Sequence, residues 1–94
     1  MKSSDKMLKT LGLAMRKGDI IIGAKRTIEA LKTTQNLIVF MSQDTASNTA
    51  KKIQDKTKST NTTLNTDFST EALSQAIGKR DVKVLAMRQD AIKL

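Results

Sequence analysis

The sequence predicts an α/β fold, a three-layer α/β/α sandwich in which helices cover both faces of a sheet. Segments whose apolar residues follow helical spacing alternate regularly with short apolar runs, and this order is typical of such folds. The run Leu37–Met41 (LIVFM) is apolar at every position, as expected of a strand buried on both faces. Glycines stand at the predicted ends of several segments. Strands joined through helices are parallel by default, so the pattern alone favours a parallel sheet.

The first part of the chain predicts two helices and two strands. Residues 3–17 show an amphipathic pattern that ends with two basic residues and Gly18, a usual helix terminus. The apolar face of this helix contains Met7, Leu8, Leu11, Ala14 and Met15. Residues 20–22 then predict a short strand, residues 24–34 a second helix, and Leu37–Met41 the second strand.

The middle of the chain predicts two further helices around a weak strand. A third helix is expected to begin after a cap at Asp44 or Thr45. Its inner face contains Ala46, Ala50 and Ile53. A weak third strand surrounds Leu64, and Ser69 is expected to cap a fourth helix that ends at Gly78.

The last part of the chain predicts one strand and one helix. Phe68 precedes the cap of the fourth helix and Leu73 follows four residues after it, which is the spacing of a hydrophobic staple. Val82–Met87 is predicted as a fourth strand, and residues 88–94 as a short final helix. The predicted order is therefore a regular alternation of five helices with four strands.

The composition indicates one domain, residues 1–94, with a polyanionic partner. Its 94 residues suit a single modest core. The chain carries 17 basic against 9 acidic side chains, and its pI is near 10.1, which favours nucleic acid over a basic surface without a partner. A membrane surface is less favoured, because interfacial helices need bulky apolar anchors and only two aromatic residues, Phe40 and Phe68, are present.

The residue types present argue against an enzyme and against a metal or cofactor site. Without cysteine or histidine, the chain lacks the thiolate nucleophile, the usual neutral-pH base and the commonest metal ligands. It contains neither a nucleophile-elbow motif nor a glycine-rich phosphate loop. The start, MKSSDKML, lacks the apolar core of a signal peptide, and no apolar run approaches the roughly 20 residues of a membrane span. We therefore expect a non-catalytic cytoplasmic protein.

One short stretch, IIGAKRTIEAL, combines features of an anion-binding site. Gly23 permits a sharp turn or a close approach by a ligand, and Ala24 leaves space beside it. The free N–H groups of the helix start would act as donors, and Lys25 and Arg26 add positive charge. Both cations can also donate to guanine O6 and N7. A plain tight turn with solvated cations explains the stretch equally well.

A second basic turn, Gly78-Lys79-Arg80-Asp81, follows the fourth helix. Cations suit a helix C-terminus, so this turn also has a purely structural explanation. The two turns would share one edge of the sheet only if the fourth strand runs antiparallel to the first. The lysines of the third helix are interpreted as a solvated face that adds diffuse phosphate attraction. They are Lys51, Lys52, Lys56 and Lys58.

The sequence resembles the ribosomal protein family that binds kink-turn RNA, of the archaeal L7Ae and eukaryotic L30e type, and most of all its bacterial YlxQ branch. Three ordered segments carry the resemblance: LGLAMRKGDIIIGAKRTIEALK, NLIVFMSQDTASNTAKKI and TEALSQAIGKRDVKVLAM. Together they cover about residues 5–92. The resemblance implies a mixed four-stranded sheet with the fourth strand antiparallel, which would bring the two basic turns to one edge.

The resemblance also implies the residues of an RNA site. In the family, the segment matching Gly23, Ala24, Lys25 and Arg26 enters the RNA major groove at sheared G·A pairs. The loop matching Lys79, Arg80, Asp81 and Val82 clamps the neighbouring nucleotides. The chain departs from the family pattern at four places, one of which is the loop after Gly78, because it is charged here and usually more apolar. Archaeal-type members have Asn-Glu instead of Lys25-Arg26, many members have lysine at Glu29, and glycine is usual at Ser74.

The resulting expectation is a ribosome-associated RNA-binding protein that is monomeric, needs no cofactor, and recognises a kink-turn-like or other structured RNA. The alternative is a protein–protein adaptor whose basic surface is incidental.

Overall fold

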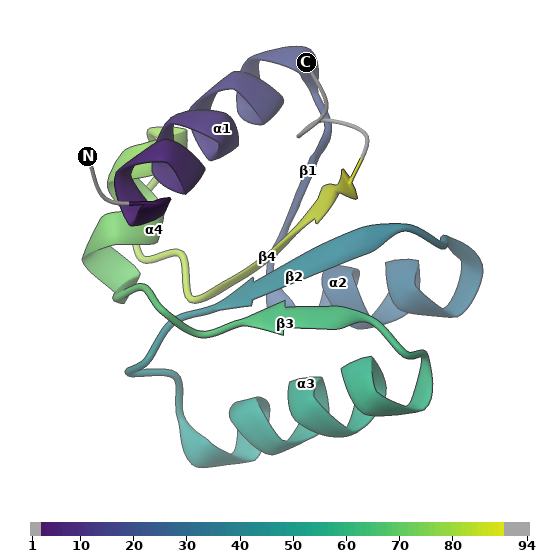
Figure 1. Ribbon diagram of the computed structural model, residues 1–94. Coiled ribbons are helices and arrows are strands. Elements are labelled where there is room, and N and C mark those ends of the chain that lie inside the picture. Colours follow the sequence, from purple (N-terminus) through teal and green to yellow (C-terminus); the bar gives the residue numbers. More distant parts are fainter. Residues whose placement is uncertain (1–2, 90–94) are drawn as a thin grey trace.

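A computed structural model describes residues 3–89 and shows one sheet between two layers of helices (Figure 1). Helices α1 and α4 cover one face of the sheet, and α2 and α3 cover the other. The three-layer α/β/α sandwich is therefore confirmed. In chain order the elements are α1 (Ser3–Lys17), β1 (Ile20–Ile22), α2 (Ala24–Thr33), β2 (Leu37–Met41), α3 (Ser47–Ser59), β3 (Thr63–Asn65), α4 (Thr70–Ile77) and β4 (Val84–Arg88).

The four strands form a mixed sheet in the order β1-β4-β2-β3. Strand β4 lies between β1 and β2 and is antiparallel to both, whereas β2 and β3 are parallel. The sheet implied by the family resemblance is thus confirmed, and the all-parallel default is wrong for β4. The difference arises in the connection, because the loop after α4 starts β4 beside the end of β2 instead of beside its beginning.

Successive residues of the strands supply two separate cores, one on each face of the sheet. Phe40, Leu85 and Met87 pack with α1 and α4, whereas Val39 and Ala86 pack with α2 and α3. This division explains why the run LIVFM is apolar throughout, because neighbouring side chains enter different cores. Both aromatic residues lie in the first core, where the ring centroids of Phe40 and Phe68 are 6.2 Å apart.

The fourth helix begins as the sequence predicts. The backbone N–H of Ala72 donates to Oγ of Ser69 at 3.1 Å, so the predicted cap is confirmed. Phe68 and Leu73 are both buried in the first core, in agreement with the predicted staple. Gly78 ends the helix in the left-handed conformation, with φ of 69°.

Several predicted boundaries are wrong. Helix α3 begins after Ala46, which provides no side-chain cap, because the Asp44 carboxylate accepts hydrogen bonds from Thr70 instead. Helix α2 ends at Thr33 rather than at residue 34. Strand β4 begins two residues late, since the N–H of Val82 donates to a side chain instead of a neighbouring strand. Arg88 belongs to β4, and residues 90–94 of the predicted final helix lie outside the described residues.

The strand directions bring several connections to one end of the sheet, which we call the turn end. Strands β1, β2 and β3 point the same way, and the antiparallel β4 begins where they finish. The turn end therefore contains residues 23–26, 42–46, 66–69 and 79–83. Both basic turns of the sequence belong to this set.

Candidate nucleic-acid interface

The first basic turn depends on an unusual backbone conformation at Gly23. Its φ of 104° and ψ of 148° fall in a region that residues with a side chain rarely adopt. The N–H of Gly23 donates to the carbonyl oxygen of Val84 at 2.8 Å. This bond ties the end of β1 to the start of β4, and the chain then turns at once into α2.

Helix α2 begins without a side-chain cap, because glycine has no side chain to offer. Its first intrahelical bond runs from the N–H of Thr27 to the carbonyl oxygen of Gly23 at 3.0 Å. The amides of Ala24, Lys25 and Arg26 thus precede the hydrogen-bonded ladder. The side chains of Lys25 and Arg26 are exposed, and neither forms an ion pair within the described part of the chain. This helix start can bind an anion with backbone donors and two cations.

The second basic turn presents two cations without carboxylate partners. Lys79 and Arg80 are exposed, and among residues 3–89 neither forms an ion pair. Asp81 has a φ of 55°, a left-handed conformation that aspartate tolerates better than most residues. Its carboxylate lies 3.0 Å from Nζ of Lys83. Asp81 therefore offsets the charge of Lys83 and leaves the other two cations available for a ligand.

The second basic turn is held in place by Ser74 and by Ser42, the residue that follows β2. The Ser74 hydroxyl donates to the carbonyl oxygen of Thr70 at 2.6 Å and accepts the N–H of Val82 at 2.8 Å. The Val82 side chain is buried in the first core, so this residue anchors the loop rather than exposing a side chain to a ligand. The N–H of Ser42 donates to the carbonyl oxygen of Lys83 at 2.7 Å.

A polar cluster beside this loop joins the turn after β2 to the start of α4. Asp44 accepts the N–H of Thr70 at 3.0 Å and its hydroxyl at 2.8 Å. The Ser42 and Thr45 hydroxyls lie 2.7 Å apart, and the Thr70 hydroxyl lies 3.1 Å from that of Ser42. The Thr70 hydroxyl and amide bonds hold the pKa of the Asp44 carboxyl below its usual range, because they favour the charged form.

The lowered pKa of Asp44 predicts a pH dependence of stability. Its contribution should be fully present above the unfolded-state pKa, near 4, and be lost as the pH falls through the folded value. We expect Asp44→Asn to show a smaller loss of stability on acidification than the wild type. Urea denaturation of both proteins between about pH 3 and pH 7 measures this difference. Equal pH profiles for the two proteins would contradict the assignment.

The structure brings the two predicted turns together at the turn end. The hydrogen bond from Gly23 to Val84 joins the first turn to the strand that the second turn enters. Sequence reasoning missed the hydrogen bonds of Ser74, the contacts of Asp44 and the pairing of Lys83. Only Lys83 left a local signal, two residues after Asp81 in the segment KRDVK.

Residues 3–89 contain neither a metal-binding cluster nor a helix that could span a membrane. No group of three or more acidic side chains in this range is arranged to hold a metal ion. No helix in the same range is both long and apolar enough to cross a membrane.

Comparisons with known proteins agree with the fold. A family model described as the ribosomal protein L7Ae/L30e/S12e/Gadd45 family matches residues 5–93. The chain is 36% identical over 74 residues to the RNA-binding protein YlxQ of Enterococcus faecium, covering 79% of this chain and 72% of that protein. A solved structure of a protein with unknown function from Bacillus halodurans is 30% identical, with a TM-score of 0.84. That likeness covers 88% of this chain and 84% of the other.

Proposed function

Because the chain belongs to the ribosomal protein L7Ae/L30e/S12e/Gadd45 family, we propose that it is a non-catalytic protein that binds a kink-turn-like or other sharply bent RNA. Residues 1–94 act as one RNA-binding domain. The proposed contacts are Gly23, Ala24, Lys25 and Arg26 in the first turn and Lys79 and Arg80 in the second, where Asp81 and Val82 shape and anchor the loop. The protein works as a cytoplasmic monomer in association with the ribosome, without a cofactor.

The observation that carries this proposal is the bond between the N–H of Gly23 and the carbonyl of Val84. It fixes an amide-rich helix start next to a loop that presents Lys79 and Arg80. Two basic turns at one end of a sheet can contact a bent RNA from both sides of the bend. The cations supply phosphate attraction, and Lys25 and Arg26 can also reach guanine edges.

The relative that has an RNA-binding name supports the same proposal. The YlxQ protein of Enterococcus faecium is similar to this chain over 74 residues, a length that can include both turns. Two details of this chain bear on the proposed contacts: Lys25-Arg26 at the helix start, and Glu29 one turn later. The carboxylate of Glu29 lies 3.6 Å from Nζ of Lys32, so its charge is partly offset at the surface.

The double change of Lys25 and Arg26 to alanine tests the proposal. We expect affinity for a bent RNA with tandem G·A pairs to fall by about 10-fold or more, because a good contact to a base contributes about 1–3 kcal/mol. Stability should hardly change, since both side chains are exposed and alanine favours helices. The measurement is RNA binding at several salt concentrations, with a straight duplex of equal length as competitor.

The matched control is Lys6→Ala with Lys9→Ala, which removes two exposed charges from α1 in the opposite layer. Equal losses from the two double variants would show diffuse attraction rather than a site. Undetectable RNA binding at low salt would overturn the proposal and leave the adaptor as the better explanation.

A further inference from the structure

The layer formed by α2 and α3 carries an excess of positive charge, and all of it except Lys25 and Arg26 lies outside the proposed RNA site. Its two helices hold seven basic side chains and two acidic ones. The basic residues are Lys25, Arg26, Lys32, Lys51, Lys52, Lys56 and Lys58. Within residues 3–89, the only ion pair on either helix joins Lys32 to Glu29. The four lysines of α3 therefore have no carboxylate partner in the described part of the chain.

The fold aligns these charges with the turn end. Helices α2 and α3 pack side by side against one face of the sheet (Figure 1). Each follows one of two parallel strands, so both helices start at the turn end and run in the same direction. The cations of α3 thus extend away from the proposed RNA site over residues 51–58, about 10 Å of a helix that is about 20 Å long.

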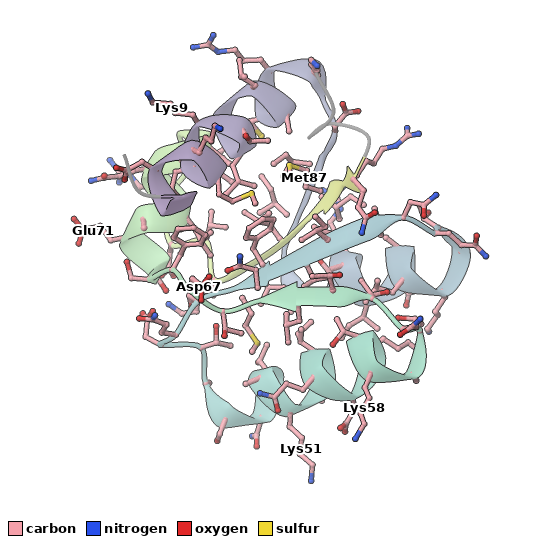
Figure 2. The ribbon with its side chains drawn as sticks, in the orientation of Figure 1. Lys9, Lys51, Lys58, Asp67, Glu71 and Met87 are labelled. Carbon is pink, nitrogen blue, oxygen red and sulfur yellow. The ribbon has the colours of Figure 1, made fainter. Side chains whose placement is uncertain are left out.

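A shallow, open groove lies between α3 and Ile28 of α2. It has a volume of about 470 Å³ and is lined by Ile28 of α2 and by Lys52, Asp55, Lys56 and Ser59 of α3. Lys56 is half-buried, whereas Lys52 is exposed, and the two lie one helical turn apart on the same face of α3. Figure 2 shows that Lys51 and Lys58, by contrast, point away from the sheet into solvent.

The side chains of the groove are suited to contact the sugar-phosphate backbone of a nucleic acid rather than its bases. Proteins that hold single-stranded nucleic acid stack bases on aromatic side chains. The only aromatic residues here, Phe40 and Phe68, are buried in the other core. Two lysines beside the apolar side chain of Ile28 outnumber the one carboxylate of the groove, Asp55. They can contact phosphates and ribose, which are the parts that a double-stranded RNA stem displays.

We infer that the α2–α3 groove is a second RNA-contact surface, which holds the sugar-phosphate backbone of the stem adjoining the bend bound at the turn end. Lys52 and Lys56 contact its phosphates, and Ile28 contacts ribose. This inference rests on the proposed function. It adds a stem-length requirement that binding at the two turns does not need.

The test uses two double variants. One carries both Lys52→Gln and Lys56→Gln in the groove, and the control carries both Lys6→Gln and Lys9→Gln on α1. Glutamine keeps most of the side-chain length and has similar helix propensity, and both variants lose the same charge. Binding is measured to a bent RNA with two long stems, to versions in which one stem is shortened, and to a version with both stems short. Thermal denaturation confirms that both variants fold.

We expect the groove variant to bind the long-stem RNA on the order of 10-fold more weakly, and the salt slope to fall by about 1 for each lysine. Its affinity for the RNA with both stems short should match that of the wild type. One of the two stems should account for the whole effect. The α1 control should change little with any of these RNAs.

Equal losses from the two double variants would overturn the inference, and so would equal losses with long and short stems. With either result, the wild type could still bind bent RNA more tightly than a straight duplex, and the proposed function would then stand. If the wild type bound a straight duplex as tightly as the bent RNA, the proposed function would fail, together with the inference that rests on it.

Discussion

Gly23→Ala is expected to lower the free energy of unfolding by about 1–3 kcal/mol and to weaken RNA binding as well. The cost comes from the backbone, because a Cβ added at this position would meet no atom within 4 Å. Gly23 has φ of 104° and ψ of 148°, a conformation that glycine adopts readily and alanine adopts only with strain. Relief of that strain would shift the start of α2, and with it the amides and cations of the proposed site.

Gly18→Ala provides the matched control for this prediction. Gly18 also has a positive φ, 77°, and its added Cβ would likewise meet no atom within 4 Å. It lies between α1 and β1, away from the turn end. We therefore expect a loss of stability without a loss of RNA affinity when both variants are measured well below their melting temperatures. If Gly23→Ala retained both wild-type stability and wild-type affinity, the role assigned to this turn would be wrong.

Ser74→Ala is the second change expected to have a large effect. The Ser74 hydroxyl is the acceptor for the buried N–H of Val82, and alanine would leave that amide without its partner. A buried donor that loses its acceptor costs about 1–3 kcal/mol. The loss should appear in chemical denaturation, and hydrogen exchange at the Val82 amide should become faster. RNA binding should weaken as well, because the bond fixes the loop that presents Lys79 and Arg80.

Thr57→Val is the control for Ser74→Ala, because it also removes a buried hydroxyl but leaves no backbone amide without its acceptor. Thr57 is also buried, but its hydroxyl donates only to carbonyls of its own helix, Ile53 at 2.9 Å and Gln54 at 3.1 Å. Those carbonyls belong to the helical ladder, so valine should cost less than 1 kcal/mol or so. Equal effects of the two changes on stability and on Val82 exchange would refute the role given to Ser74.

Ser74 also explains one departure from the family pattern. The resemblance gives glycine as the usual residue at this position, and glycine has no hydroxyl to accept the Val82 amide. The serine therefore adds a bond between α4 and the second basic turn that a glycine could not form. Sequence reasoning identified the difference but not its purpose, because the two partners meet only after α4 has ended.

Local signals in the sequence predicted most of the fold. The run LIVFM identified the doubly buried β2, and helical spacing gave α1 without error in its bounds. Ser69 was predicted as a cap because its acceptor role depends on residues immediately after it. Asp44 has the same local appearance, yet its partner is Thr70, 26 positions away in sequence. Such a distant partner leaves no trace in a local pattern.

The residues of the candidate site also divide into those that a local pattern reveals and those whose arrangement depends on distant parts of the chain. Gly23, Lys25 and Arg26 could be selected from one stretch, because a glycine turn and a helix start are local features. Their relation to Lys79 and Arg80 depends on the direction of β4, which periodicity does not reveal. The family resemblance supplied that direction, and the pairing of β4 with β1 and β2 confirms it.

The position of β4 in the sheet also sets the order in which the protein can assemble. β4 comes after every other described element in the chain, yet it is the hydrogen-bonded neighbour of both β1 and β2. Its side chains enter both cores, Leu85 and Met87 on one face and Val84 and Ala86 on the other. Synthesis proceeds from the N-terminus, so β1 remains without a sheet partner until β4 has emerged. Gly23 gains its acceptor on Val84 at that same moment. A nascent chain therefore completes its sheet, both cores and the first basic turn in one late step, on which the RNA contacts proposed for this turn depend.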